Sequence, residues 1–247
     1  MKEYRWYIVT VATLITASVL GYTIQVMVFH HKRDTFFYLL QDLAFLPVQV
    51  LLVTLVVNGW FQMREREELL RKTNVVVGTF FIEIGNLLLR YFSEFDVNIA
   101  DMRKMADIQA DWSNRDFISL KKRMDVHEYA IDCRSADIRE LRRLLIGRRE
   151  FILGLLANPG LIENTGFSEL LWAISHLTQE LELRQDFDNL PDTDYAHLAV
   201  DIRRAYILLV QEWVSYIRRL KDSYPYMYSL MVRADPFASE QSVIVTK

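Results

Sequence analysis

Two long apolar runs, at residues 6–29 and 43–61, contain no charged residue. A helix rises about 1.5 Å per residue, so each run is long enough to cross the roughly 30 Å hydrocarbon core of a bilayer. A backbone in lipid must satisfy its hydrogen bonds within its own segment, and a helix does so. Both runs are also longer than the apolar core of a cleaved signal peptide. The sequence therefore predicts a transmembrane helical hairpin over residues 1–62.

Basic residues flank this hairpin unevenly. Two precede the first run and four follow the second within residues 64–72, whereas the connecting loop holds only Lys32 and Arg33. Because basic flanks stay on the cytoplasmic side, both termini are predicted to be cytoplasmic. The single cysteine, Cys133, excludes an internal disulfide and fits a reducing compartment.

Residues 63–237 have the pattern of an all-α cytosolic domain, a bundle of about six helices. Glycine and proline are sparse, 8 and 5 in 247 residues, and apolar residues recur at steps of three or four. Asn-Pro-Gly at 158–160 and Leu-Pro-Asp at 190–192 mark breaks. Helices are predicted at residues 98–111, 113–129, 135–157, 168–184 and 193–224, and a flexible tail at 238–247.

Residues 74–93 are apolar except for one polar stripe along a helix. Glu83 and Arg90 belong to this stripe, and each would cost about 3 kcal/mol near the centre of a bilayer. We therefore expect a helix packed under the membrane or within the cytosolic core, with a third span as the alternative. The stripe consists of Thr79, Glu83, Asn86, Arg90 and Ser93.

Small and polar residues also share faces within the hairpin. Ala17 and Gly21 allow close approach of another helix, either the second span or the same span of another subunit. Asp42 and Gln49 share a face of the second run, and a carboxylate in a membrane segment is a functional candidate. Asp42, however, lies near the outer interface, where water reaches it. The candidate pore or helix-interface residues are Thr13, Ala17, Gly21, Gln25, Asp42, Gln49, Glu83 and Asn86.

The sequence offers one weak metal-ligand pattern. His176 and Glu180 lie four apart on one predicted helix, and Asp194 and His197 lie three apart on the next. Imidazoles and carboxylates suit several divalent cations. The Glu-x-x-His pairs typical of carboxylate-bridged bundle sites are missing, however. We therefore interpret these four as surface or capping residues and predict neither a metal nor a cofactor.

Catalytic signatures are weaker still. Cys133 lies near His127 and Asp132, but neighbours in sequence do not establish a catalytic geometry. Neither a Gly-x-x-x-x-Gly-Lys loop nor a Gly-x-Gly-x-x-Gly motif occurs, so phosphate-binding enzymes are not supported. The prediction is that the protein is not an enzyme.

A basic stretch on the predicted helix 135–157 is a candidate for contact with anionic lipid headgroups. Its residues are Arg139, Arg142 and Arg143. The alternative is a solvated face paired with nearby acidic residues. The formal net charge of −3 gives no basic footprint for nucleic acid, so no nucleic-acid partner is predicted.

Three segments resemble an uncharacterised family of two-span prokaryotic membrane proteins with a helical cytoplasmic domain. They are FLPVQVLLVTLVV at 45–57, GTFFIEIG at 78–85 and YPYMYSLMVRADPF at 224–237. The resemblance covers most of the chain. It implies this architecture and a prokaryotic cytoplasmic membrane as the location, but it assigns no function to any residue.

The leading functional hypothesis is a non-enzymatic, membrane-tethered interaction or sensory module that self-associates through its hairpin. Its expected partners are the lipid bilayer, further copies of the chain and a cytosolic protein. The alternative is a homo-oligomeric ion channel, because two spans per subunit can line a pore only when several subunits form a ring.

Overall fold

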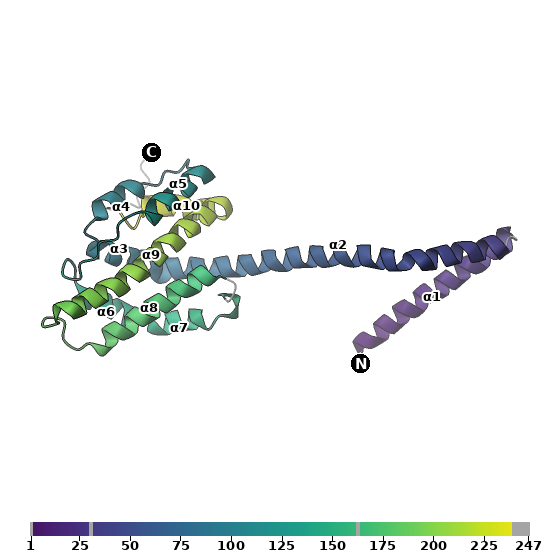
Figure 1. The fold of residues 1–247 in the computed structure, drawn as a ribbon, viewed down its shortest axis with the longest axis horizontal. Coiled ribbons are helices and arrows are strands. Elements are labelled where there is room, and N and C mark those ends of the chain that lie inside the picture. Colours follow the sequence, from purple (N-terminus) through teal and green to yellow (C-terminus); the bar gives the residue numbers. More distant parts are fainter. Residues whose placement is uncertain (1, 30–31, 162–163, 239–247) are drawn as a thin grey trace. The chain divides into compact units, whose positions relative to one another are not determined.

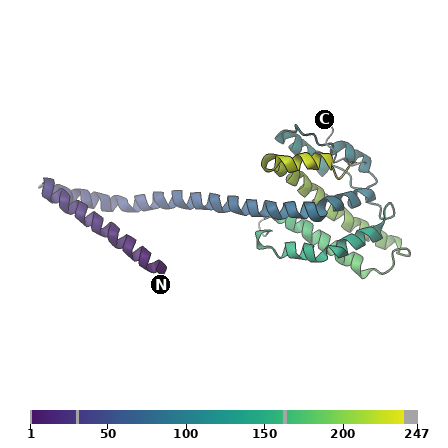
Figure 2. The same ribbon diagram turned by 180° about the vertical axis from the view of Figure 1, so that it is seen from behind.

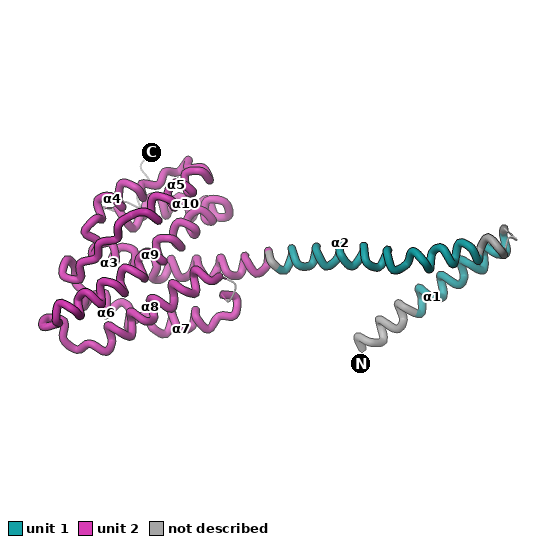
Figure 3. Tube along the Cα trace, viewed as in Figure 1, with its two compact units in different colours: residues 1–66 teal, residues 67–247 magenta. Residues whose placement is uncertain are grey.

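The computed structural model describes residues 2–29, 32–161 and 164–238. Every regular element in that part of the chain is helical, and the one β-bridge, between Asp96 and Ile131, is isolated. The all-α prediction is therefore confirmed for the described residues. The chain divides into an N-terminal unit, residues 1–66, and a helical domain, residues 67–247 (Figure 3).

The N-terminal unit consists of α1 (Lys2–Phe29) and the first part of α2 (Lys32–Phe80), which contains Pro47. Its described apolar side chains are largely exposed. By length and composition, one helix in the described part of the chain could cross a membrane, and it begins at Phe36. In α1 the described side chains form a shorter apolar helix, Ala12–Val28. The two-span hairpin therefore stays a prediction.

The helical domain is built around α9 (Asp192–Ser223). Helices α3, α5, α8 and α10 pack against it, α6 and α7 pack on α8, and α4 packs on α5 (Figures 1 and 2). The bounds of these elements are α3 Asn86–Phe95, α4 Ile99–Met105, α5 Asn114–Asp125, α6 Ile138–Gly147, α7 Arg149–Leu156, the 3-10 turn η2 Pro159–Leu161, α8 Thr165–Leu183 and α10 Pro225–Arg233.

The helix patterns of the sequence explain most of these elements. The predicted apolar stripe of α9 is buried throughout, from Leu198 to Leu220. Ser113 and Asp116 form a capping box at the start of α5, and the Asp137 side chain caps α6. The predicted helix 98–111 was too long, since α4 ends at Met105.

Two further differences concern helix breaks. The predicted helix 135–157 is divided at Arg148, whose backbone N–H bonds to the carbonyls of Leu144 and Leu145. The sequence analysis also predicted no separate helix after residue 224, where α10 begins with Pro225 at its first position. Residues 239–247 of the predicted tail lie outside the described part.

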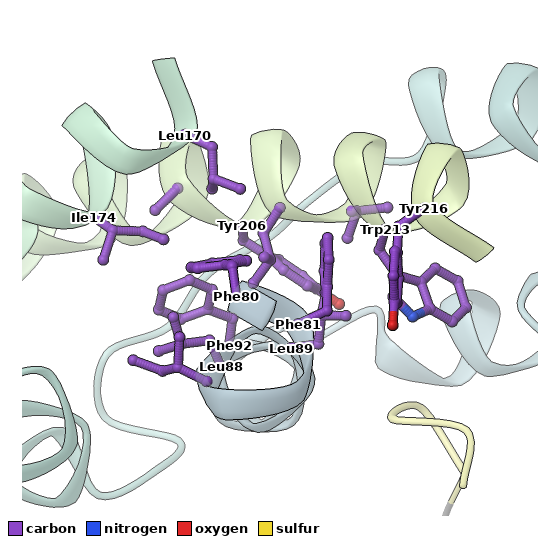
Figure 4. Close-up of a cluster of buried hydrophobic side chains, with 14 of the residues drawn as sticks. Phe80, Phe81, Leu88, Leu89, Phe92, Leu170, Ile174, Tyr206, Trp213 and Tyr216 are labelled. Atoms are coloured by element: carbon purple, nitrogen blue, oxygen red, sulfur yellow. The ribbon is translucent and has the colours of Figure 1, made fainter. Parts of the chain in front are cut away.

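The apolar stretch 74–93 lies inside the helical domain. It contains the end of α2, a π-helical turn η1 (Phe81–Gly85) and most of α3. Phe80, Phe81 and Phe92 are fully buried and point toward α8 and α9 (Figure 4). The polar stripe is exposed at Glu83 but not at Ser93, which is 5% exposed. The expectation that the whole polar stripe is exposed was therefore wrong at Ser93. The Ser93 hydroxyl donates to the Arg90 carbonyl of its own helix, and this hydrogen bond allows the side chain to be buried.

Gly85 ends the π turn at a point where two aromatic rings leave no space. A Cβ there would stand 2.6 Å from Phe81 Cδ1 and 2.8 Å from Phe80 Cε1, and both rings are fully buried. We therefore expect Gly85→Ala to lower the free energy of unfolding by about 1–3 kcal/mol. Urea unfolding of the full chain in detergent, followed by circular dichroism, measures this change.

The matched control is Gly154→Ala in α7. A Cβ at Gly154 meets nothing within 4 Å, and alanine favours a helix by up to about 1 kcal/mol over glycine. This variant should be as stable as the wild type or slightly more stable. Equal stabilities for the two variants would contradict the proposed crowding at the π turn.

Candidate functional site

Two pairs of ionisable residues, one on α8 and one on α9, meet where these two helices pack together. His176 and Glu180 are four residues apart on α8, and His197 and Asp201 are four apart on α9. A spacing of four places both members of each pair on one helix face. Because α8 and α9 pack on each other, the four side chains converge, and we call them the α8–α9 cluster.

Asp201 lies at the middle of the α8–α9 cluster. Its Oδ2 atom is 3.5 Å from His176 Nε2 and 3.4 Å from His197 Nε2. Glu180 closes the arrangement, with Oε2 at 3.7 Å from His197 Nε2 and Oε1 at 4.0 Å from His176 Nε2. One ligand atom each from Glu180, His197 and Asp201 can be chosen so that all three lie within 4.8 Å of one another.

The cluster is closed on one side and open on the other. Asp201 is 4% exposed, and its Oδ2 has no hydrogen-bond partner among the described residues. The side chains of His176 and His197 are about half exposed. Asp201 was not predicted from the sequence as a site residue. Its spacing of four from His197 repeats that of His176 and Glu180, and this signal could have identified it.

Arg184 determines which carboxylates belong to the cluster. Its guanidinium binds both oxygens of Asp194 at 2.7 Å and also donates to Glu180 Oε2 at 2.6 Å. These hydrogen bonds lower the pKa of Asp194 and of Glu180, so both carboxyls are held ionised. Of the four residues interpreted as surface or capping residues, Asp194 is held by Arg184 through both carboxylate oxygens. Asp201 lies beside His176 and His197 instead.

A cavity of about 270 Å³ borders the open side of the cluster. It is lined by His176 together with Trp172, Ile152 and Leu153. Trp172 is 66% exposed, which is unusual for so large an apolar side chain. The arrangement therefore combines nitrogen and oxygen donors with an adjoining apolar surface.

The residues noted near Cys133 have other partners in the structure. His127 Nε2 lies 3.1 Å from Asp96 Oδ2, and both side chains are buried. The Asp132 carboxylate instead accepts from the backbone N–H of Arg134. His127 thus pairs with Asp96 and helps to fix the segment that follows α5. No local pattern indicates this pair, because its members are 31 residues apart.

The predicted interface residues of the hairpin lie in the N-terminal unit. Asp42 Oδ2 accepts a hydrogen bond of 3.2 Å from the Tyr22 hydroxyl, which links α1 to α2. Gly21 meets nothing within 4 Å of its Cβ position, so the small-residue face is not packed against α2. Thr13, Ala17 and Gln49 are exposed, and Gln25 is half-buried.

The remaining predicted residues lie in the helical domain and are engaged within it. Glu83 lies 3.4 Å from Arg148, and the Asn86 amide donates to Met231 Sδ at 3.6 Å. Among the predicted lipid contacts, Arg139 pairs with Asp188, Arg142 Nε donates to the Leu181 carbonyl at 3.0 Å, and Arg143 lies 3.9 Å from Glu140. The predicted contact of these arginines with lipid headgroups is not tested by this geometry and stays a prediction.

Together these features define an all-helical protein with an apolar helical N-terminal unit and an α9-centred domain. The chain belongs to the MJ1433 family. Residues 2–60 match "MJ1433, N-terminal helical domain", and residues 69–233 match "Uncharacterized protein MJ1433, C-terminal helical domain". The two matches lie on either side of the structural boundary between residues 66 and 67.

One archaeal relative, "Uncharacterized protein MJ1433" of Methanocaldococcus jannaschii, is 40% identical over 245 residues. The alignment covers 99% of this chain and 98% of the relative. No solved structure matches. The resemblance to an uncharacterised family with a helical domain is thus confirmed, whereas the two membrane spans remain a prediction.

Burial makes Cys133 a poor nucleophile. It is 4% exposed, and desolvation raises the pKa of its thiol from 9.0 to about 12. Only the thiolate reacts, so at pH 8 we expect the native chain to be modified by a disulfide reagent on the order of 1,000-fold more slowly than the unfolded chain. The native rate should rise with pH. Absorbance-monitored labelling in detergent measures both rates, and rapid native labelling would contradict this assignment.

Proposed function

We propose that this protein is a membrane-anchored helical interaction or sensory module without enzymatic activity. The N-terminal unit anchors the chain in a bilayer as a two-helix hairpin. The helical domain lies in the cytoplasm, where it contacts a protein partner, and copies of the chain associate through the hairpin.

The exposed apolar surface of α2 carries this proposal. The most apolar 18-residue window of the long helix that begins at Phe36 is 0% buried. Large side chains such as Leu51, Val56 and Phe61 are more than half exposed. Soluble monomers rarely expose apolar patches of more than a few hundred Å², and larger patches mark membrane or protein contacts. A bilayer satisfies this surface on all sides of a helix.

The distribution of polar groups supports the same arrangement. In α1 the hydroxyls of Thr16 and Thr23 donate to the carbonyls of Ala12 and Val19, one turn earlier. The Tyr22 hydroxyl is directed to Asp42. These side chains therefore find partners within the unit, as polar groups in a membrane segment must.

Membrane fractionation of cells that express the full chain tests the anchor. We expect the protein to stay in the membrane pellet after an alkaline carbonate wash and to enter solution with detergent, because two apolar helices bind lipid essentially irreversibly. Protease added outside intact spheroplasts should spare the helical domain and digest it only after lysis. Recovery of the chain in the carbonate supernatant, or digestion from outside, would overturn this arrangement.

Cysteine cross-linking in native membranes tests self-association. Ala17→Cys should give a disulfide-linked dimer under mild oxidation, because Ala17 lies on the small-residue face that admits a second helix. Val19→Cys is the control, since it is two residues away and faces the opposite side of α1. The buried Cys133 can stay in both variants. Equal cross-linking of the two variants would contradict a specific α1 interface, and ion conductance in a planar bilayer would support the channel alternative instead.

A further inference from the structure

We propose that the α8–α9 cluster binds a first-row divalent transition-metal cation such as Zn²⁺. The ligands are Glu180 from α8 and His197 and Asp201 from α9, and His176 lies beside them. This site is independent of the proposed membrane anchoring, because all three ligands lie on two helices of the helical domain.

The spacing of the donor atoms fits a single metal ion. Zinc bonds to imidazole nitrogen and carboxylate oxygen measure about 2.0–2.2 Å, so two tetrahedral ligands lie about 3.3–3.5 Å apart. Asp201 Oδ2 lies 3.5 Å and 3.4 Å from the two Nε2 atoms of His176 and His197. The contacts of Glu180 are longer, at 3.7 Å to His197 and 4.0 Å to His176, and its Oε2 atom also accepts a hydrogen bond from Arg184.

Asp201 provides the independent indication of a ligand. Its side chain is 5% exposed, and Oδ2 has no hydrogen-bond partner among the described residues while it faces two imidazole nitrogens. Burial of a carboxylate oxygen without a donor or a cation is costly. A dication bound by Glu180, His197 and Asp201 would supply the missing partner.

The charge of the surroundings also favours a cation. Glu180, Asp194 and Asp201 contribute three carboxylates, against one guanidinium from Arg184. With neutral imidazoles, which are the form that binds metal, the negative charges exceed the positive by two. Arg184 acts as a positioning residue, because it holds Glu180 through Oε2 and leaves Oε1 toward His176.

The competing interpretation is a set of partly solvated ion pairs between protonated imidazoles and carboxylates. Exposed pairs of that kind contribute about 0–1 kcal/mol. Protonated imidazoles of His176 and His197, at 3.5 and 3.4 Å, would pair with Asp201 Oδ2, although neither makes a hydrogen bond to it in the structure. Metal titration separates the two interpretations.

Metal titration of the full chain in detergent, purified without a polyhistidine tag, tests the site. We expect Zn²⁺ to bind with one-to-one stoichiometry in competition with a chromophoric chelator, and Co²⁺ to give visible absorption typical of nitrogen and oxygen ligands. His197→Gln and Asp201→Asn should each weaken Zn²⁺ binding by more than about 100-fold, since even outer-sphere changes cost 10–100-fold. Circular dichroism checks that each variant remains folded, and His197 is exposed enough to be replaced without disturbing the core.

Two controls separate this site from other metal ligands. Glu182→Gln removes a carboxylate of α8 that pairs with Arg149 outside the cluster, and His30→Gln/His31→Gln removes the two adjacent histidines between the apolar runs of the sequence. Both variants should bind Zn²⁺ as the wild type does. The absence of saturable binding in the wild type would overturn the proposal, as would loss of binding in the His30/His31 variant with retention in both cluster variants.

Discussion

Burial of α9 from several sides is the constraint on which the helical domain depends. Phe81 in the π turn stacks on Tyr216 with ring centroids 4.6 Å apart, and Phe92 meets the edge of Tyr206 at 6.1 Å. Complete burial of such a side chain contributes about 1.5–3 kcal/mol. Because α3, α5, α8 and α10 all pack on this one helix, each of them relies on the same buried stripe for its position. The packing of the core therefore fixes the geometry of the cluster between α8 and α9.

The elements that the sequence predicts well are those with a long apolar repeat. Residues 193–224 and 168–184 were predicted within a few residues of α9 and α8, since their burial follows a helical period. The break at Arg148 and the π turn at Phe81–Gly85 were not predicted. Contacts between distant segments lie at both points, since the Tyr216 ring stacks on Phe81 and Arg148 lies 3.4 Å from Glu83. No local pattern contains such contacts.

The candidate site shows the same division between local pattern and tertiary contact. Three of its residues, His176, Glu180 and His197, belong to the weak metal-ligand pattern that we interpreted as surface or capping residues. Asp201 was not part of that pattern, because its burial arises only when α8 covers it. The spacing of Asp194 is equally suitable for a metal ligand, but the guanidinium of Arg184 donates hydrogen bonds to both oxygens of its carboxylate. A sequence specifies which donors are available, whereas the packing of two helices selects the donors that converge.

The position of Asp201 also bears on how the domain and the cluster affect each other. Sequences of stable domains are locally consistent, and departures from that consistency concentrate at functional sites. A buried carboxylate oxygen without a donor, placed one residue from the fully buried Ile202, is such a departure. A ligand that binds only the folded state stabilises it by about 2.7 kcal/mol at 100 times its dissociation constant. Because α8 and α9 share the most extensive helix contact in the domain, a cation at their junction would transmit that stabilisation to the whole core.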